Sequence, residues 1–138
     1  MGGGSDERIV SISTGKEVLK ALKKLKYNPK KLLINSDFKS LKKEFQDYDL
    51  IFNALHGGEG EDGKIQQWMD KNNIPYTGSG PESSSLCMDK TRSKALAKLM
   101  GINTPDWELI ENPKTVPKLQ FPIVIKPNRQ GSTFGLTI

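Results

Sequence analysis

The chain has 138 residues, of which 35% are hydrophobic and 7% aromatic, enough for one ordinary α/β domain with a modest core. Its apolar runs are far shorter than the ~20 residues of a transmembrane helix and no signal peptide is evident, so we expect a cytoplasmic protein without a membrane span. The net charge of +5 does not indicate nucleic-acid binding, because lysines between positions 16 and 43 are mixed with acidic residues and lack interleaved aromatics. We expect a solvated, lysine-rich surface.

A glycine run at positions 2–4 precedes a segment with helical spacing. Apolar residues recur every three or four positions between Ile9 and Leu25, which predicts an amphipathic helix capped by Ser5 or Asp6. Such a glycine turn exposes backbone N–H groups to an anion or a carboxylate, but Met followed by three glycines is equally typical of an expression linker. Because doubly wound domains begin with a strand and this chain begins at the turn, we expect the first strand to be missing.

Three strands and two helices are predicted between positions 31 and 77. The strands cover 31–35, 49–55 and about 74–77, and the helices are marked by Leu41 with Phe45 and by Ile65 with Trp68 and Met69. The run at 49–55 is almost continuously apolar, so we expect it to be covered on both faces as in a parallel sheet. His56 follows this strand directly. Ligands of parallel sheets bind at that end of the strands, so His56 is a candidate site residue.

From Pro81 onwards the pattern changes. One long helix is predicted from Pro81 to Met100, ended by Gly101, with Cys87 as an inert buried thiol inside it. A strand at 121–127, a turn at 128–135 and a strand from 136 predict a hairpin. A lysine at a strand end before a loop of glycines and hydroxyls can hold polyphosphate, although the hairpin alone favours an ordinary turn with a solvated lysine.

Taken together, several segments resemble the D-alanine:D-alanine ligases of the ATP-grasp superfamily. They occur in the family's order and at about its spacing: GGGSDER, ALHGGEGEDGKIQ, IPYTGSG, MDKTRSK, GINTP and FPIVIKPNRQGSTFG. The resemblance covers the whole chain, and the combination of ALHG and GEDG with YTGSG and MDK is highly specific. Members of this family are much longer, so the resemblance implies the N-terminal part of such an enzyme.

The resemblance also implies the domain organisation. Residues 1–80 would form an α/β N-terminal domain with a parallel, Rossmann-like sheet that binds the substrate and lacks its first strand. Residues 81–138 would be the beginning of an α+β ATP-grasp domain. Such ligases are commonly homodimers through the N-terminal domain, so a homodimer is expected.

For the substrate, the resemblance implies roles for three residues. Glu7 would hold the ammonium group of the first D-alanine and orient a catalytic hydroxyl network. His56 would line the same subsite near the carboxylate of that D-alanine. Ser132 would hydrogen-bond to the Glu7 network and so take part in catalysis.

For ATP, the resemblance implies four ligands. Lys90 and Lys126 look like the two lysines that bind the phosphates, and Ser132 and Thr133 match the serine pair of the phosphate-covering loop. Threonine replaces the second serine here, which preserves the hydroxyl group. The Mg²⁺ ligands and the transition-state arginine are expected beyond Ile138, so no metal ligand is assigned within the chain.

The implied reaction is phosphorylation of one D-alanine by ATP, followed by attack of the second amino acid's amine on the acyl phosphate, as a step in making peptidoglycan precursors. We expect the 138-residue chain by itself to have negligible activity. Two alternatives stay open: a non-catalytic fragment or binding module, favoured by an exposed apolar edge at 123–125, or another ATP-grasp ligase joining a carboxylate to an amine. The sequence does not distinguish D-alanine from D-lactate as the second substrate.

Overall fold

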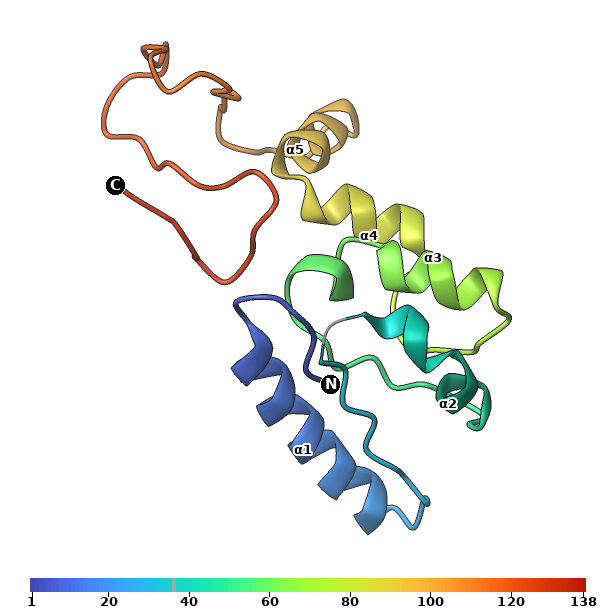
Figure 1. Ribbon diagram of the computed structural model, residues 1–138. Helices are drawn as coiled ribbons and strands as arrows, with labels where there is room; N and C mark the ends of the chain where they lie inside the picture. Colours follow the sequence, from blue (N-terminus) through green and yellow to red (C-terminus); the bar gives the residue numbers. More distant parts are fainter. Residues whose placement is uncertain (36) are drawn as a thin grey trace. The chain divides into compact units, whose positions relative to one another are not determined.

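The computed structural model describes residues 1–35 and 37–138, which divide into two units, Met1–Ser85 and Leu86–Ile138 (Figure 1). Its regular elements are helices, and strand pairing within the described residues is limited to three isolated bridges. None of the described helices is long and apolar enough to cross a lipid bilayer. The two units are described separately below, as the first unit and the second unit.

The first three residues of the first unit pair with the segment around Ile34 and are not part of a turn. Gly2 forms a parallel bridge with Ile34, where the Met1 carbonyl accepts from the Ile34 N–H (3.0 Å) and the Gly3 N–H donates to the Ile34 carbonyl (2.8 Å). The expectation that the chain begins at the turn was therefore wrong. Gly2 has a φ of 100°, and a Cβ atom there would lie 2.5 Å from the Ile34 oxygen, so the fold requires a glycine. This requirement disfavours the linker interpretation.

Helix α1 (Arg8–Lys24) forms where the apolar spacing predicts a helix, but it starts later than expected. Glu7 is its N-cap residue and makes no side-chain capping bond, so the predicted cap at Ser5 or Asp6 was wrong. The Ser5 hydroxyl donates instead to the His56 carbonyl, which ties the glycine turn to a distant loop. Long-range contacts of this kind are invisible to local capping rules.

Helix α1 buries only part of the expected apolar face. Gly15 is buried and Ile12, Leu19 and Leu22 are half-buried, whereas Ile9 is 82% exposed. Ser11 is buried as well, although it is polar. Ser11 Oγ accepts from the Gly2 N–H (2.8 Å) and donates to the Ala54 carbonyl (2.6 Å), both buried bonds. Small residues let the backbones approach closely, and the hydroxyl satisfies two polar groups that would otherwise be buried without partners.

The core of the first unit lies between 3₁₀-helix η1 (Phe38–Leu41), α2 (Lys42–Gln46), α3 (Lys64–Lys71) and the segments that connect them (Figure 1). Trp68 on α3 meets the rings of Phe38 and Phe45 edge-on, with centroids 5.4 and 5.3 Å apart. The predicted helices are confirmed here. The buried cluster consists of Ile34, Phe38, Phe45, Leu55, Ile65, Met69 and Ile74.

The segment at 49–55 pairs in parallel with the segment after α3. Ile51 bridges Tyr76, the Ile51 N–H donates to the Pro75 carbonyl (2.8 Å), and the Thr77 N–H donates to the Ile51 carbonyl (2.9 Å). The expectation that both faces of this segment are covered holds only at its end, where Ala54 and Leu55 are buried, because Leu50 is 56% and Phe52 47% exposed. Ile51 packs against the core cluster, so the buried cluster covers only the face of the segment opposite Leu50 and Phe52.

Helices α4 (Pro81–Met88) and α5 (Lys90–Leu99) replace the single long helix that the sequence predicts. Asp89 separates them: its backbone is extended, with φ −94° and ψ 104°, and its side chain accepts from the Arg92 N–H as the N-cap of α5. The hydrophobic pattern continues through this residue and conceals the break. Cys87 is exposed and α4 has no buried residue, so the expectation of a buried thiol was also wrong.

Gly101 ends α5 as predicted. It has a φ of 73° and donates its N–H to the Lys98 carbonyl (3.1 Å), while the Ile102 N–H donates to the Ala97 carbonyl (2.9 Å). These two bonds form a Schellman motif, which favours glycine at the left-handed position. Further on, Ile125 and Thr137 exchange two antiparallel bonds of 2.8 and 2.9 Å, which confirms the predicted pairing across the turn.

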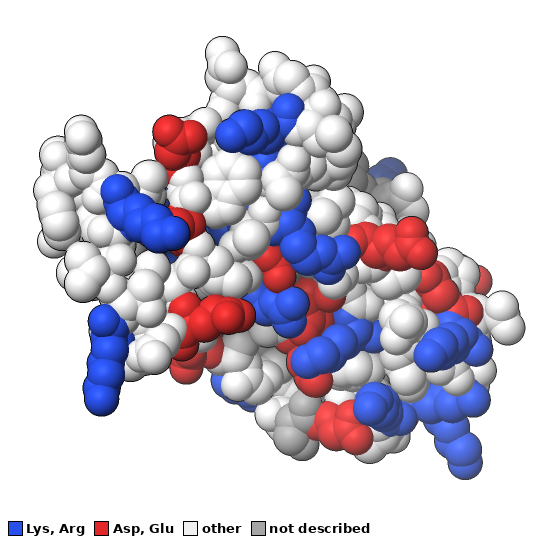
Figure 2. All heavy atoms as spheres, turned by 90° about the horizontal axis from the view of Figure 1, so that it is seen from above, with Lys and Arg blue, Asp and Glu red and all other residues white. Residues whose placement is uncertain are grey.

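Charged side chains are mixed on the surface. On the face seen in Figure 2, basic and acidic side chains are interspersed over much of the surface, and several basic side chains lie next to one another at the lower right of the view. Every lysine between positions 16 and 43 is exposed, as predicted, and Lys20 lies 3.7 Å from Glu17. Pairs this exposed contribute little to stability.

Candidate functional site

A pocket of about 210 Å³ lies in the first unit, where the segment at 49–55 ends. The glycine turn at 3–5 and the loop at 55–60 form its walls, together with Ile34 and Phe38 from the core. The Ser5 hydroxyl, which donates to the His56 carbonyl, holds the turn and the loop together. The lining combines the apolar side chains of Ile34, Phe38 and Leu55 with polar side chains and glycine backbone from the turn and the loop.

His56 is held at the rim of this pocket by two side chains from different elements. Its Nε2 atom lies 3.1 Å from Thr14 Oγ1 on α1, and its Nδ1 atom lies 3.4 Å from a carboxylate oxygen of Glu61. The imidazole is 30% exposed, so one edge remains open to solvent. A ring fixed on both nitrogens has a defined orientation, as recognition of a small polar ligand requires.

Glu7 lies beside the same loop. A Cβ atom on Gly57 would be 3.0 Å from Glu7 Oε1 and 3.2 Å from Ser5 Oγ, and Gly57 itself has a φ of 66°. The glycine thus lets a carboxylate and a hydroxyl group approach the backbone that follows His56. Glu7 therefore lies near the loop that carries His56, but only His56 is among the residues that line the pocket. The roles of Glu7 and His56 as substrate ligands remain a prediction.

Lys90, at the start of α5, reaches the turn that follows the strand segment at 121–127. Its ammonium group donates to the Pro127 carbonyl (2.8 Å) and to the Gln130 carbonyl. Burial and, secondarily, the nearby Lys126 ammonium lower the pKa of Lys90, while Asp89 opposes the shift. Two neighbouring cations at one turn can attract an anion.

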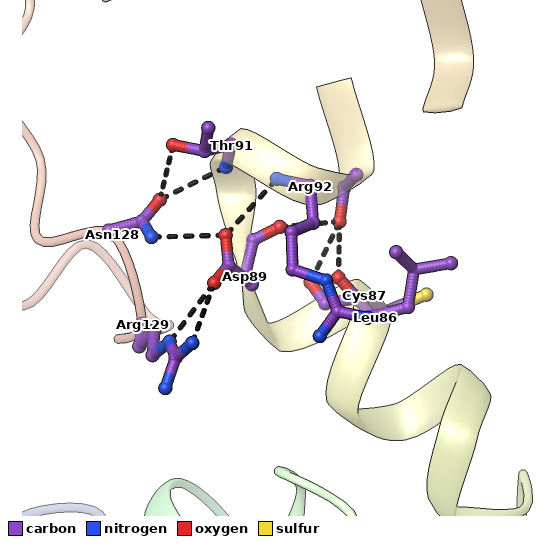
Figure 3. Close-up of polar contacts among 8 residues, drawn as sticks. Leu86, Cys87, Asp89, Thr91, Arg92, Asn128 and Arg129 are labelled. Atoms are coloured by element: carbon purple, nitrogen blue, oxygen red, sulfur yellow. Dashed lines mark hydrogen bonds and ion pairs between the residues drawn. The ribbon is translucent and has the colours of Figure 1, made fainter. Parts of the chain in front are cut away.

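Asp89 connects the start of α5 to the same turn (Figure 3). Its side chain is 7% exposed and accepts from the Arg92 N–H (3.1 Å), from Asn128 Nδ2 (3.0 Å) and from Arg129 Nε (3.0 Å). The Arg92 N–H bond, supported by the bonds from Asn128 and Arg129, lowers the pKa of this carboxyl below its usual range. Asn128 Oδ1 in turn accepts from the backbone and the hydroxyl of Thr91, both at 3.0 Å.

Ser132 and Thr133 lie at the exposed tip of this turn. Both have left-handed backbones, with φ of 53° and 57°, and the Thr133 hydroxyl donates to the Ser132 carbonyl (2.6 Å). Lys90, Lys126, Ser132 and Thr133 all belong to the second unit, whereas Glu7 belongs to the first. The contact between Ser132 and the Glu7 network therefore remains a prediction.

The chain is similar to known proteins over nearly its whole length. Residues 35–79 match a protein-family model described as D-ala D-ala ligase N-terminus. A D-alanine--D-alanine ligase of Bacillus anthracis is 43% identical over 143 residues, covering 100% of this chain and 47% of the relative. A crystal structure of D-alanine--D-alanine ligase from Bacillus anthracis matches with a TM-score of 0.87 at 40% identity, covering 99% of this chain and 46% of that one. The chain belongs to the D-alanine--D-alanine ligase family.

Two further comparisons support the same assignment. The D-alanine--D-alanine ligase of Aquifex aeolicus is 42% identical over 141 residues, which cover 100% of this chain and 48% of the relative. A Bacillus anthracis D-alanine--D-alanine ligase structure in complex with ATP matches with a TM-score of 0.79 at 39% identity, over 94% of this chain and 46% of that one. This member of the ligase family spans about half the length of the curated relatives it matches.

The part of this ligase-family chain that the structure describes does not fit a magnesium site. Residues 1–35 and 37–138 contain no group of three or more His, Cys, Asp or Glu side chains that could hold a metal ion. The carboxylates next to His56 and Lys90 already have protein partners: Glu61 contacts His56, and Asp89 binds Arg129. No step involving Mg²⁺ is therefore assigned to these residues.

Sequence reasoning missed the residues that hold the predicted ones in place. Thr14 and Glu61 orient His56, and Asn128 and Arg129 bind Asp89. Asp89 alone carried a local signal, since an aspartate followed by a helical stretch is a common N-cap. The other four act through contacts that no local pattern in this ligase-family sequence reveals.

Proposed function

We propose that this chain is part of an enzyme that joins two D-alanines to D-alanyl-D-alanine, using ATP and an acyl phosphate intermediate. The observation that carries the proposal is the similarity of nearly the whole chain to a D-alanine--D-alanine ligase structure complexed with ATP. The pocket of the first unit and the lysine pair of the second supply two chemically distinct sites, one suited to a zwitterion and one to phosphates. This division matches a reaction between an amino acid and ATP.

In the first unit, we propose that Glu7 binds the ammonium group of the first D-alanine and that His56 lies near its carboxylate. The approach of Glu7 to Gly57 and the fixed orientation of the imidazole support these roles. The apolar floor of the pocket, which includes Leu55 and Phe38, suits a small methyl side chain.

In the second unit, we propose that Lys90 and Lys126 bind the phosphates of ATP and that Ser132 and Thr133 cover them. The lowered pKa of Lys90 reflects partial desolvation of its ammonium next to another cation, a condition that a phosphate anion relieves. Ser132 is also proposed to contact the Glu7 network and so to link the two sites. Such lysines act mainly by neutralising charge on the transferred phosphoryl group.

The wider organisation of the enzyme is proposed on the same grounds. Residues 1–80 would form a Rossmann-like domain with a parallel sheet, which the parallel bridges at Ile34 and Tyr76 favour. Residues 81–138 would begin the ATP-grasp domain. Mg²⁺, held by residues outside this chain, a homodimer, a cytoplasmic location and a role in cell-wall precursor synthesis complete the proposal.

A second candidate function is a non-catalytic binding module. It is favoured by the exposed apolar side chains of the hairpin, where Val124 is 53% and Ile125 59% exposed. Another ATP-grasp ligase that joins a carboxylate to an amine would use the same lysine pair, but the first-unit pocket favours a small zwitterion. Both alternatives predict no D-alanine-dependent ADP release.

The test is ADP release with ATP, Mg²⁺ and D-alanine, measured on this chain and on a version extended at both ends from the source DNA. We expect D-alanine-dependent turnover in the extended protein and negligible turnover in the 138-residue chain, because the described residues provide no metal site. Turnover by the short chain would contradict the proposed origin of the catalytic charge. No turnover in either protein would favour the binding module or another substrate.

A matched pair of lysine variants tests the phosphate site in the extended enzyme. Lys126→Gln is expected to lower kcat/KM for ATP by roughly a hundredfold or more, as loss of a preorganised charge contact does. Lys118→Gln removes an exposed lysine of the same unit and should change little. Equal kinetics in the two variants would remove Lys126 from the site.

A further inference from the structure

Asp89 makes more contacts than the capping of α5 requires. One capping bond, to the Arg92 N–H, starts the helix, but the carboxylate also accepts from Asn128 Nδ2 and Arg129 Nε, and Arg129 Nη2 lies 3.0 Å from its second oxygen. Within the second unit, all of which the structure describes, Asp89 is the one buried residue. Charge-assisted bonds of this kind are stronger than neutral ones and fix geometry as well as energy.

The bonds surrounding Asp89 fix the main chain of Lys90 from both sides. The Lys90 N–H donates to the Asn128 carbonyl (3.0 Å), and the next residue, Thr91, donates its N–H and its hydroxyl to Asn128 Oδ1. Asn128 is thus bonded to three consecutive residues, Asp89 to Thr91, as Figure 3 shows for its side chain. The start of α5 and the turn at 127–130 are held together as one body.

The ammonium group of Lys90 completes this body and leaves one donor for a ligand. A lysine ammonium has three N–H donors, and two of them bind the carbonyls of Pro127 and Gln130. The direction of the third is set by the positions of those two carbonyls. It therefore depends on how the turn is held relative to α5, and so on Asp89.

We propose that Asp89 is a positioning residue of the phosphate site: by binding the first turn of α5, Asn128 and Arg129 at once, it holds Lys90 against the turn at 127–135. This inference rests on the proposed function, since it takes the second unit to bind the phosphates of ATP. Asp89 does not touch the phosphate itself. It acts through Lys90 and the turn.

Charge and position predict opposite effects when the carboxylate is removed. If only charge matters, loss of a negative group beside an anion site strengthens anion binding. If Asp89 positions Lys90, its loss weakens binding even though the site becomes more positive. The sign of the change therefore distinguishes the two explanations.

Asp89→Asn is the variant of choice, because asparagine caps helices as well as aspartate does. The amide oxygen keeps the cap of α5, while the amide nitrogen replaces the carboxylate oxygen that faces Arg129 and cannot accept its N–H groups. Inorganic tripolyphosphate, titrated into the 138-residue chain at constant ionic strength, serves as the probe, and binding is followed by the NMR shifts of backbone amides at 90–91 and 131–135. We expect roughly tenfold weaker binding, in line with the loss of a charge-assisted bond.

Asp37→Asn is the matched control. Asp37 is the exposed N-cap of η1 in the first unit, where its carboxylate accepts from the Lys39 N–H (2.9 Å). It caps a helix as Asp89 does, but it belongs to the unit that contains none of the proposed phosphate ligands. The same change of one carboxylate to an amide is expected to leave tripolyphosphate affinity within about twofold of that of the unchanged chain.

Amide hydrogen exchange gives a readout that does not need the ligand. The N–H groups of Lys90 and Thr91 donate to Asn128, so we expect their exchange to become roughly tenfold faster or more in Asp89→Asn. The Met100 N–H, bonded to the Leu96 carbonyl at the other end of α5, should keep its rate. Faster exchange at all three amides would indicate unfolding of the helix and overturn the proposal of a local positioning role.

The outcomes separate this inference from the proposed function. If the unchanged chain binds tripolyphosphate and Asp89→Asn binds it equally well or more tightly, the positioning role is overturned and the phosphate site stands. Unchanged exchange at Lys90 and Thr91 also overturns it. If tripolyphosphate shifts no amide signals of the unchanged chain, and the Lys90→Gln and Lys126→Gln variants give the same result as the unchanged chain, the phosphate site itself is refuted and the inference with it.

Discussion

The two units of the chain are held together by different kinds of interaction. The first unit buries a cluster of hydrophobic side chains, including Phe45 at 1% and Met69 at 0% exposure. In the second unit, which the structure describes throughout, the one buried residue is a carboxylate, Asp89, and apolar groups such as Val116 and Phe121 are 80% and 78% exposed. Hydrophobic burial is the main source of folding free energy, whereas a network of hydrogen bonds contributes far less net stability but fixes geometry. Within this chain, hydrophobic burial thus stabilises the first unit, and the hydrogen bonds around Asp89 fix the geometry of the second.

The largest expected effect comes from removing core volume in the first unit. Met69→Ala should lower the free energy of unfolding by about 2–5 kcal/mol, because Met69 is fully buried in the cluster. Urea unfolding followed by the fluorescence of Trp68, which packs against this cluster, would measure the loss. Met100→Ala is the matched control in the second unit. Because Met100 is 67% exposed, this substitution should lower the free energy of unfolding by less than about 0.5 kcal/mol. Similar losses in both variants would remove the contrast between the units.

The next effect tests close backbone packing in the first unit. Gly63, the N-cap of α3, has a φ of 93°, and a Cβ atom there would lie 2.3 Å from the Pro81 carbonyl oxygen. Gly63→Ala should destabilise the unit by about 1–3 kcal/mol or more, because backbone strain and a clash with main-chain atoms add together. Gly78→Ala tests the backbone strain alone, since Gly78 has a φ of 109° and a Cβ atom added there would have nothing within 4 Å. Thermal unfolding should rank Gly63→Ala as the more damaging; the reverse order would contradict the packing described.

A stabilising change should follow from the end of α1. Lys26 has a φ of 64° and occupies the left-handed position of a Schellman motif, where its N–H donates to the Lys23 carbonyl (3.0 Å). Lys26→Gly should raise stability by about 1 kcal/mol in urea unfolding, since glycine adopts this conformation without the cost of a Cβ. Asn73→Gly, at the equivalent position after α3 with a φ of 53°, should gain less, because asparagine tolerates this region well. An equal gain at both sites would show that left-handed strain is not the cause.

The smallest expected effect is the acid sensitivity of the second unit. The pKa of Asp89 is lowered in the folded chain, so its contribution is fully present above the ordinary aspartate pKa of about 3.9 and is lost as pH falls through the folded-state pKa. The effect on global stability is small because the Arg129 side chain is 72% exposed and solvent screens the pair, so a local measurement at α5 is needed to detect it. Exchange of the Lys90 amide between about pH 5 and pH 2, corrected for its intrinsic rate, should reveal this loss. In Asp89→Asn this pH-dependent loss of protection of the Lys90 amide should be absent. If it persists in the variant, another carboxyl group causes it.

Much of the candidate site followed from local sequence patterns. The helical spacing predicted α1, α2 and α3, the glycine at 101 marked the end of α5, and the hairpin pairing of Ile125 with Thr137 was anticipated. His56 was found because residues that directly follow a strand of a parallel sheet lie at its binding edge. These features depend on interactions between residues a few positions apart, so the sequence alone is enough to predict them.

Tertiary contacts decided the rest. The hydrophobic pattern predicted Ile9 on the buried face of α1, yet Ile9 is exposed and Ser11 is buried through its two hydrogen bonds. Asp89 separates α4 from α5 by capping the Arg92 N–H, and its bonds to Asn128 and Arg129, about 40 residues away along the chain, could not be read from the local pattern. The partners of His56, Thr14 and Glu61, likewise come from separate elements. The sequence by itself determined the helices, the turns and the chemical groups of the site; only the folded chain determined which of those groups meet, because a hydrogen bond or a buried contact depends on distance in space and not along the chain.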